Sequence, residues 1–229
     1  MTPRALEALK TADIIACEDT RRTWALLSHF GIPRPAEMVS YRQGNEDRVG
    51  EQLLSALTAG KKVALCSDGG CPGISDPGYR LIQSVAESRL PMTMTPGVSA
   101  ATMALVLSGL PTSSFTFKGF PPRKPSALRA FFEDEKTTPH TLVVYEAPYR
   151  LVPTLKAALA ALGDRKAALC LELTKLHESV RRGWLSEIVA ECEGRTVKGE
   201  ATIVIAGNHP RFVLKDTTVA EQVSCSTDP

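Results

Sequence analysis

The sequence has no long run of apolar residues. Although 43% of its 229 residues are hydrophobic, no run approaches the roughly 20 consecutive residues that a membrane-spanning helix needs. The opening segment, MTPRALEALK, lacks the basic and then apolar pattern of a secretory signal peptide. We therefore expect a cytoplasmic protein that has no membrane partner.

Closely paired cysteines are also scarce. The six cysteines, at positions 17, 66, 71, 170, 192 and 225, are scattered, and Cys66 and Cys71 have no second close pair to complete a zinc site. His177 lacks a second ligand at a usable spacing. We therefore assign no metal and expect reduced thiols.

Two phosphate-binding motifs are absent from the sequence. It contains neither GxxxxGK[ST] nor a GxGxxG segment after a strand, so we do not expect nucleotide phosphates to bind by those mechanisms. A net charge of +2 argues neither for nor against a nucleic-acid partner. The small basic pairs at 21–22, 123–124 and 181–182 matter only if the fold gathers them on one face.

Short apolar strands alternate with helical segments along the chain. In the first half we predict helices over 3–10, 20–30, 46–59, 78–88 and 98–108, and strands over 13–17, 62–66 and 92–95. In the second half we predict strands over 115–118, 141–145, 167–173 and 200–206, and helices over 126–133, 151–162 and 184–191. This order predicts an α/β fold with a mainly parallel sheet that is covered on both faces.

Small, turn-prone residues at 108–114 favour a domain boundary. We predict an N-terminal α/β domain over 1–112, a C-terminal α/β domain over 113–209 and a weakly ordered tail over 210–229.

Loops of unusual composition follow the predicted strands. In SDGGCPGISDP, residues 67–77, glycines let the backbone come close to a ligand, and prolines hold the loop rigid. The segment PGVSA, residues 96–100, has the same combination of proline and glycine after the next predicted strand. Ligands of open parallel sheets bind beyond the carboxyl ends of the strands. Either loop alone would pass for a plain turn, but two adjacent ones favour a binding site.

Several longer motifs resemble one known family. The segments that carry the likeness are IIACEDTRRTWALLSHFGI, VALCSDGGCPGISDPGYRLI, PGVSAATMALVLSGLPTSSFTFKGFPPRK, LVVYEAPYRL, ELTKLHESVRRG and KGEATIVIAG. In this order, from about Thr2 to about Gly207, they resemble the ribosomal RNA small subunit methyltransferase I family, which has the tetrapyrrole-methylase fold.

The resemblance implies a two-domain α/β protein, with a mainly parallel sheet in the N-terminal domain and a mixed sheet in the C-terminal domain. Members of the family are usually dimeric and bind S-adenosylmethionine in the cleft between the domains. They methylate the ribose 2′-hydroxyl of a cytidine in small-subunit ribosomal RNA. We therefore expect S-adenosylmethionine, the small ribosomal subunit RNA and a second copy of the chain as partners.

The sequence also departs from the family pattern. Members ordinarily open with a strand and a Gly-Asn-Leu-x-Asp loop ahead of the segment that matches Thr2–Glu7, and this sequence contains neither. A gene start placed too late would account for this, and so would a compromised chain. At single positions, Gly69, Cys71 and Tyr149 stand where alanine, threonine and histidine are usual.

The resemblance assigns a set of residues in matching motifs to the methyl-donor pocket. They are Asp68, Gly69, Gly70, Pro72, Gly73, Ile74, Pro96, Gly97, Ser99 and Ala100, with Tyr145, Glu200 and Ala201 from the second domain. Basic residues of the same motifs could contact RNA phosphates. They are Arg21, Arg22, Arg123, Lys124, Arg150 and Lys175. Tyr41 and Tyr149 could stack on bases, although a tyrosine more often only packs against other residues.

Methylation of a hydroxyl is helped by a general base, and four carboxylates at strand ends are candidates. They are Glu18, Asp19, Glu146 and Glu172. Asp19 could instead cap the helix that begins at Thr20, and Glu172 could belong to an ordinary surface ion pair with Lys175.

Two other functions stay open at this point. The first is methylation of a small tetrapyrrole, against which the CEDTR and ELTKLHE segments speak. The second is a non-catalytic remnant or a ribosome-binding protein, because the first strand and its loop are absent from the sequence.

Overall fold

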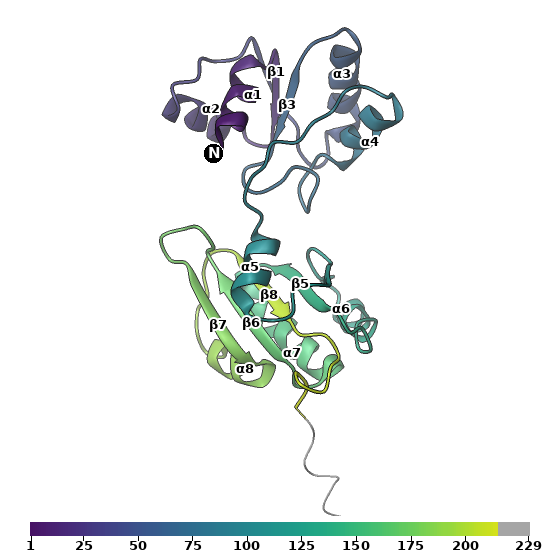
Figure 1. Ribbon diagram of the computed structural model, residues 1–229, viewed down its shortest axis with the longest axis vertical. Coiled ribbons are helices and arrows are strands. Elements are labelled where there is room, and N and C mark those ends of the chain that lie inside the picture. The colour runs from purple at the N-terminus through teal and green to yellow at the C-terminus, as the bar shows by residue number, and fades with distance from the viewer. Residues whose placement is uncertain (215–229) are drawn as a thin grey trace, which may run out of the picture. The chain divides into compact units, whose positions relative to one another are not determined.

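The computed structural model describes residues 1–214, which form two compact units (Figure 1). The first unit covers residues 1–99, and the second begins at Ala100. Most of the predicted tail and Cys225 lie outside the described residues. Within residues 1–214, no helix is both long and apolar enough to cross a lipid bilayer.

The first unit is a small three-layer α/β structure. Its strands are β1 (Ile14–Cys17), β2 (Glu37–Ser40) and β3 (Val63–Cys66), which lie parallel in the order β2-β1-β3. Its helices are α1 (Pro3–Thr11), α2 (Thr20–His29), α3 (Glu46–Thr58) and α4 (Tyr79–Glu87). The parallel sheet expected for the N-terminal part is thus confirmed.

Alternation along β1 explains how helices cover both faces of this sheet. Ile14 and Ala16 belong to the cluster formed with α3 and α4, whereas Ile15 packs with the residues of α1 and α2. All four residues of β1 are buried, as expected for a central parallel strand.

The second unit is built around a mixed five-stranded sheet in the order β4-β5-β8-β6-β7. The strands are β4 (Phe115–Phe117), β5 (Thr141–Glu146), β6 (Lys166–Leu171), β7 (Ser179–Trp184) and β8 (Ala201–Ile205). The helices are α5 (Ala100–Ser108), α6 (Pro125–Glu133), a 3-10 turn η1 (Pro148–Arg150), α7 (Leu151–Leu162) and α8 (Leu185–Cys192). Only β4 and β5 pair in parallel, so the mixed sheet expected for the C-terminal part is also confirmed.

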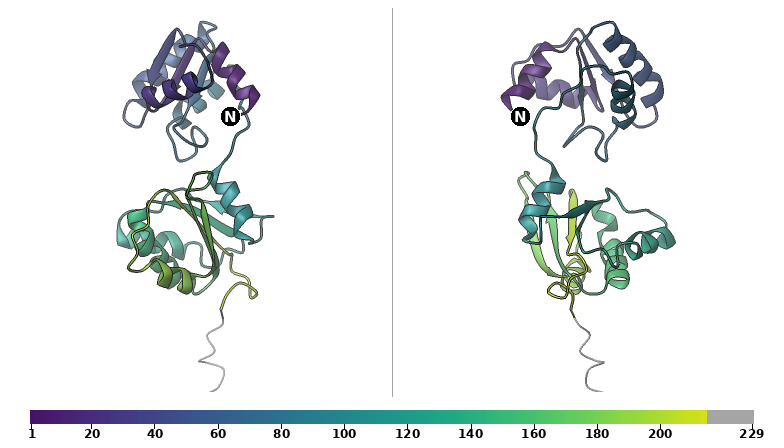
Figure 2. Two further views of the ribbon diagram at one scale, coloured as in Figure 1. Left: turned by 90° about the vertical axis from the view of Figure 1, so that its left-hand side faces the viewer. Right: turned by 45° about the vertical axis from the view of Figure 1, so that its right-hand side comes forward.

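The sheet of the second unit separates α5 from the other helices, as the turned views in Figure 2 show. Ala101, Ala104 and Leu105 of α5 pack on one face, with Val143 and Val204 of the sheet. The residues next to these in the strands, such as Leu142 and Ile203, face α6, α7 and α8.

This packing puts the boundary between the units after Ser99, whereas the sequence analysis placed it after residue 112. The apolar helix α5 follows the first unit in sequence, but its buried side chains are covered by the second sheet. Composition marks the turn at 108–114, yet it does not tell which sheet a helix covers.

The structure differs from the predicted elements at three places. The strand predicted over 92–95 is absent, since residues 91–99 form neither helix nor strand, and Met92 and Met94 are 56% and 65% exposed. Strands β2 and β7 were not predicted. Both are edge strands of their sheets with few buried residues, so they lack the apolar pattern that marks a strand.

Candidate active site

The loop between β3 and α4, residues 67–78, is held closed by its own backbone and by α3. The Gly73 N–H donates to the Pro77 carbonyl at 3.2 Å, and the Ile74 N–H donates to the Cys71 carbonyl at 3.1 Å. From α3, the Glu46 carboxylate accepts a hydrogen bond from the Gly78 N–H at 3.2 Å. The rigidity that the Gly and Pro content predicts thus has a physical basis in these bonds.

Two kinds of glycine occur in and near this loop. Gly78 has φ +144°, and a Cβ added there would lie 2.9 Å from the Gly73 nitrogen and 3.1 Å from Leu65 Cδ2. Its role is therefore to let the loop close. At Gly69, Gly70 and Gly97, an added Cβ would meet nothing within 4 Å. There the bare backbone faces open space, so a ligand can approach it closely.

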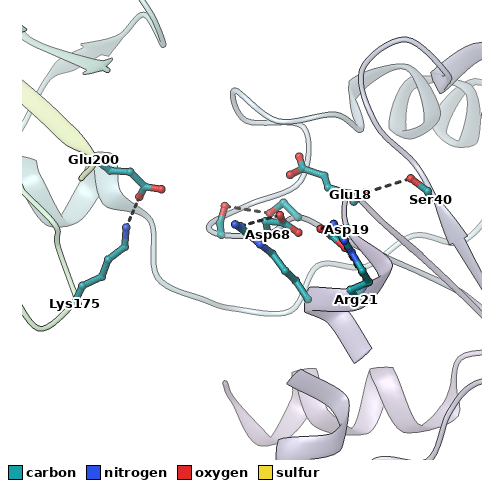
Figure 3. A network of polar contacts seen from close by, with 10 residues as sticks. Glu18, Asp19, Arg21, Ser40, Asp68, Lys175 and Glu200 are labelled. Atoms are coloured by element: carbon teal, nitrogen blue, oxygen red, sulfur yellow. Dashed lines mark hydrogen bonds and ion pairs between the residues drawn. The ribbon is translucent and has the colours of Figure 1, made fainter. Parts of the chain in front are cut away.

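Asp19 follows β1 and caps α2. Its Oδ1 accepts from the Arg21 N–H at 2.9 Å, and its Oδ2 pairs with the Arg21 guanidinium at 3.0 Å (Figure 3). Hydrogen bonds from the Arg21 side chain and backbone lower the pKa of this carboxyl to about 2. The N-cap alternative for Asp19 is therefore what the structure shows, and its strongly acidic carboxyl is a poor proton acceptor near neutral pH.

Glu18 precedes this cap, and its environment is different. Partial burial, followed by the negative charges of Asp76 and Asp68, raises the pKa of its carboxyl above the ordinary value of 4.5. Its backbone carbonyl accepts a hydrogen bond from the Ser40 hydroxyl at the end of β2, at 3.2 Å. Of the two adjacent carboxylates, Glu18 is the better proton acceptor, because a raised pKa brings its proton affinity closer to that needed near neutral pH.

Asp68 and Arg22 connect the loop to α2. Arg22 Nη1 lies 3.1 Å from Asp68 Oδ2, and Figure 3 shows Asp68 beside Asp19. Residues predicted for the donor and for RNA are thus paired with each other in this structure. The structure brings Glu18, Asp19, Arg22 and Asp68 together at the carboxyl ends of β1 and β3, which are neighbours in register.

In the second unit, Tyr145 and Ala101 are joined by a hydrogen bond. The Tyr145 hydroxyl accepts from the Ala101 N–H at 3.1 Å, and its ring packs edge-on against Phe117 and Phe120. This bond ties the end of β5 to the start of α5, next to Ala100 of the predicted donor loop.

Glu146 is buried, with only 2% of its surface exposed. Its Oε1 accepts from the Ala147 N–H at 2.8 Å, and its Oε2 accepts from the Thr154 hydroxyl at 2.5 Å. The Arg150 guanidinium lies 3.5 Å from the same Oε2. Protein groups thus contact both oxygens of the Glu146 carboxylate.

Glu172 lies in a second cluster of ionic contacts. Lys175 Nζ pairs with Glu172 Oε1 at 3.0 Å and with Glu200 Oε2 at 3.1 Å, and the latter contact is drawn in Figure 3. Oε1 also accepts from the Glu200 N–H at 2.7 Å. The hydrogen bond from Lys175, together with that from Glu200, lowers the pKa of the Glu172 carboxyl. The ion-pair alternative for Glu172 and Lys175 is thus what the structure shows.

The remaining residues predicted for RNA divide into three kinds. Arg123 and Lys124 are exposed, whereas the Arg150 guanidinium donates to the carbonyls of Pro121 and Pro122 at 3.2 and 2.8 Å. Tyr149 is 77% exposed and available for stacking. Tyr41 is 1% exposed and packs in the core of the first unit, so the prediction that it stacks on RNA is wrong.

Sequence reasoning missed three contributors to these sites. Asp76 raises the pKa of Glu18, Glu46 of α3 bonds to the loop after β3, and Gly199 leaves room for the Glu172 carboxylate. A Cβ at Gly199 would lie 2.2 Å from Glu172 Cδ, and the φ of +88° there also favours glycine. Asp76 lies in the SDPG segment and Gly199 in the KGE segment, so both belong to motifs that the sequence had already singled out.

The sequence and the fold match one class of proteins. The family model for Tetrapyrrole (Corrin/Porphyrin) Methylases matches residues 1–189, so the chain belongs to the tetrapyrrole methylases. Solved structures agree on the fold. The methyltransferase CobJ superposes with a TM-score of 0.65 at 15% identity, covering 91% of this chain and 88% of that one. A uroporphyrin-III C-methyltransferase from Thermus thermophilus, solved with S-adenyl homocysteine, gives 0.56 at 22% identity, covering 89% and 90%.

Curated relatives narrow the assignment. The ribosomal RNA small subunit methyltransferase I of Halalkalibacterium halodurans is 45% identical over 91% of this chain and 71% of its own length. The protein of that name from Synechocystis sp. is 42% identical over 92% of this chain and 75% of its own length. Within the tetrapyrrole methylases, the chain therefore belongs to the ribosomal RNA small subunit methyltransferase I family.

Proposed function

We propose that this protein transfers a methyl group from S-adenosylmethionine to the ribose 2′-hydroxyl of a cytidine in small-subunit ribosomal RNA. Membership of the ribosomal RNA small subunit methyltransferase I family supports the reaction class. The structural observation that carries the proposal is the braced loop after β3, whose glycines Gly69 and Gly70 face open space.

The loop residues suit a bulky, adenosine-containing methyl donor. The backbone at Gly69, Gly70 and Gly97 has open space where a Cβ would lie, so a ligand can approach the main chain there; the Gly69 carbonyl already accepts a hydrogen bond from the Ser67 hydroxyl at 3.2 Å. Because hydrogen bonds already hold the loop closed, binding would require little further ordering. We assign Asp68–Ile74 and Pro96–Ala100 to the donor, and we keep Tyr145, Glu200 and Ala201 as the second unit's predicted contributions.

When bound, the donor supplies a methyl group on a sulfonium, so that the carbon–sulfur bond breaks as the bond to the ribose oxygen forms. The protein's own task is to position the reactants and to accept the hydroxyl proton. Orientation alone can recover about 7–11 kcal/mol of a reaction barrier. We assign the proton to the Glu18 carboxylate, because burial and neighbouring charges raise its pKa whereas that of Asp19 is lowered. A general base typically contributes about 10²–10⁴-fold.

The experiment that tests the reaction is methyl transfer to purified small ribosomal subunits that lack the modification. The protein is incubated with these subunits and labelled S-adenosylmethionine, and digested RNA is searched by mass spectrometry for 2′-O-methylcytidine. We expect one labelled cytidine. Label in uroporphyrinogen, with none in RNA, would instead support tetrapyrrole methylation. Donor binding without transfer to either substrate would favour a non-catalytic protein.

A pair of variants tests the assigned base. Glu18→Gln retains the size of the side chain but cannot accept the proton, so kcat should fall about 10²–10⁴-fold. Glu37→Gln is the matched control, since Glu37 is exposed at the start of β2 and has no assigned role. Equal rates for the two variants would remove Glu18 from the mechanism.

The partners that the resemblance implies remain predictions. Size-exclusion chromatography with light scattering tests the homodimer, and fractionation of cells tests the cytoplasmic location.

A further inference from the structure

A cavity of about 500 Å³ opens in the second unit beside the end of β5. Its apolar part includes Leu128 of α6 together with Pro153 and Ala157 of α7, and its polar part includes Arg123, Tyr149 and Arg150. A volume in this range suits a small organic ligand, and a mostly apolar wall with a few polar groups is typical of ligand pockets.

Of the two arginines that line this cavity, one is paired with a carboxylate and the other has no such partner among the residues that the structure describes. Arg150 is paired with the buried carboxylate of Glu146 at 3.5 Å. Arg123 is exposed and forms no ion pair with any residue of the described chain 1–214. The cavity therefore presents one uncompensated positive charge, which favours a ligand that carries negative charge.

Arg150 also positions the segment that bears Arg123. Its Nη2 donates to the carbonyls of Pro121 and Pro122, the two residues that precede Arg123. The same Nη2 lies 3.5 Å from Oε2 of Glu146, which is itself bonded to Thr154. The chain from Thr154 through Glu146 and Arg150 thus braces one wall of the cavity, and Arg150 is a positioning residue.

Tyr149 supplies a flat apolar surface at the same cavity. It belongs to the 3-10 turn η1 and is 77% exposed, so its ring is not used by the protein core. An exposed aromatic ring next to a free arginine fits a ligand with a planar ring and a phosphate. A nucleotide of single-stranded RNA has both, and base stacking on an aromatic ring contributes about 1–3 kcal/mol.

We propose that this cavity binds one unstacked nucleotide of the RNA substrate, with its phosphate on Arg123 and its base against Tyr149. The proposal rests on the proposed function, because it takes RNA as the substrate. It also divides the predicted RNA contacts of the second unit, since Arg123 would touch RNA and Arg150 would hold the wall in place.

Salt dependence of RNA binding tests the phosphate contact. Binding of a labelled single-stranded RNA of about 12 nucleotides, a length within the range of single-strand sites, is measured by fluorescence anisotropy at several salt concentrations. Arg123→Ala should weaken binding and reduce the slope of log K against log salt by about 0.7, the value for one phosphate of a single strand. Arg129→Ala is the matched control, because Arg129 is exposed on α6, pairs with Glu133 and does not line the cavity.

A second pair of variants tests stacking. Tyr149→Ala should raise the dissociation constant about 5- to 150-fold, whereas Tyr149→Phe should bind within about twofold of the wild type. The side chains of Arg123 and Tyr149 are both exposed, so the melting temperature should be the same for all these variants. Equal slopes for Arg123→Ala and Arg129→Ala, or equal affinities for the alanine and phenylalanine variants, would overturn the proposal. Competition by a mononucleotide at the same concentration as RNA would identify a small-ligand pocket and overturn it as well.

Methyl transfer to small ribosomal subunits, measured in parallel, separates this proposal from the proposed function. A wild-type protein that methylates subunits, with variants that bind RNA normally, would remove the nucleotide site and leave the function. RNA binding that responds to both variants, without any methyl transfer, would keep the site and remove the function.

Discussion

Gly78 allows the loop after β3 to close, and its replacement by alanine is the sharpest test of that structure. The added Cβ would lie 2.9 Å from the backbone nitrogen of Gly73 and 3.1 Å from Leu65 Cδ2. Backbone cannot move aside as the end of a long side chain can. In addition, φ of +144° is a conformation that only glycine adopts without strain.

These two effects set the size of the change. Backbone strain of this kind costs about 1–3 kcal/mol, and overpacking a closed site costs a similar amount. We therefore expect Gly78→Ala to lower the free energy of unfolding of the first unit by about 2–6 kcal/mol. Each kcal/mol corresponds to about 4–8 °C in Tm for a unit of this size. Calorimetry measures the melting, and titration with S-adenosylmethionine should show weaker binding, because the loop can no longer close.

Gly50→Ala is the matched control in the same unit. Gly50 lies inside α3, and an added Cβ there would be 3.9 Å from Tyr41, an ordinary contact. Alanine should raise stability by about 0.5–1 kcal/mol, since it restricts the unfolded chain more than glycine does. If Gly78→Ala melted at the wild-type temperature, the closed loop described above would be incorrect.

Three further predictions concern Glu146, Glu18 and the buried thiols. Glu146→Ala leaves the Arg150 guanidinium without its counter-charge, and should destabilise the second unit by about 3–5 kcal/mol in urea unfolding. Glu146→Gln can still bond to Thr154 and should cost less; equal losses would mean that the carboxylate bonds are unimportant. For Glu18, a raised pKa places the acid limb of the kcat/KM profile above the ordinary glutamate value of 4.5. Asp76→Asn removes one of the charges that raise this pKa, so the acid limb should move to lower pH; a shift to higher pH would contradict the assignment. The same raised pKa makes Glu18 unfavourable to folding above that pKa, a penalty that fades as the pH falls through it. Cys170 is buried and Cys66 is partly buried, and this burial raises the pKa of both thiols to about 11, so both should resist iodoacetamide near neutral pH in the native protein. Mass spectrometry after timed alkylation measures this, and rapid labelling of either thiol would show that its burial is incorrect.

In the loop after β3, the local sequence predicts the rigidity but not every contact that produces it. Glycine and proline content indicated a rigid loop over 67–77, and the structure shows the hydrogen bonds that brace it. Sequence could not indicate that Glu46, some 30 residues earlier, provides one of them. That contact depends on where α3 lies in the fold.

For the candidate carboxylates, the sequence likewise predicts the positions, whereas the fold sets the surroundings. Their positions at strand ends followed from the apolar pattern, which is local. Their roles differ because Asp19 is bonded to Arg21, Glu18 lies near Asp76 and Asp68, and Glu146 is buried against Thr154 and Arg150. The pKa of a carboxyl depends on its burial and on nearby charges. For Asp19 the nearby charge comes from Arg21, two residues away, whereas for Glu18 the charges that raise the pKa come from other segments of the chain.

By itself, the sequence determined the α/β class and most helices and strands, because periodicity and turn chemistry act between near neighbours in the chain. Its motifs also carried the resemblance to the family. Only the tertiary structure decided that α5 belongs to the second unit, that 92–95 forms no strand and that Tyr41 is buried. It also decided that Asp76 and Asp68 lie close enough to raise the pKa of Glu18, and that Arg123 forms no ion pair within residues 1–214. These outcomes depend on contacts between distant segments, whose burial and charge exist only once the chain has folded.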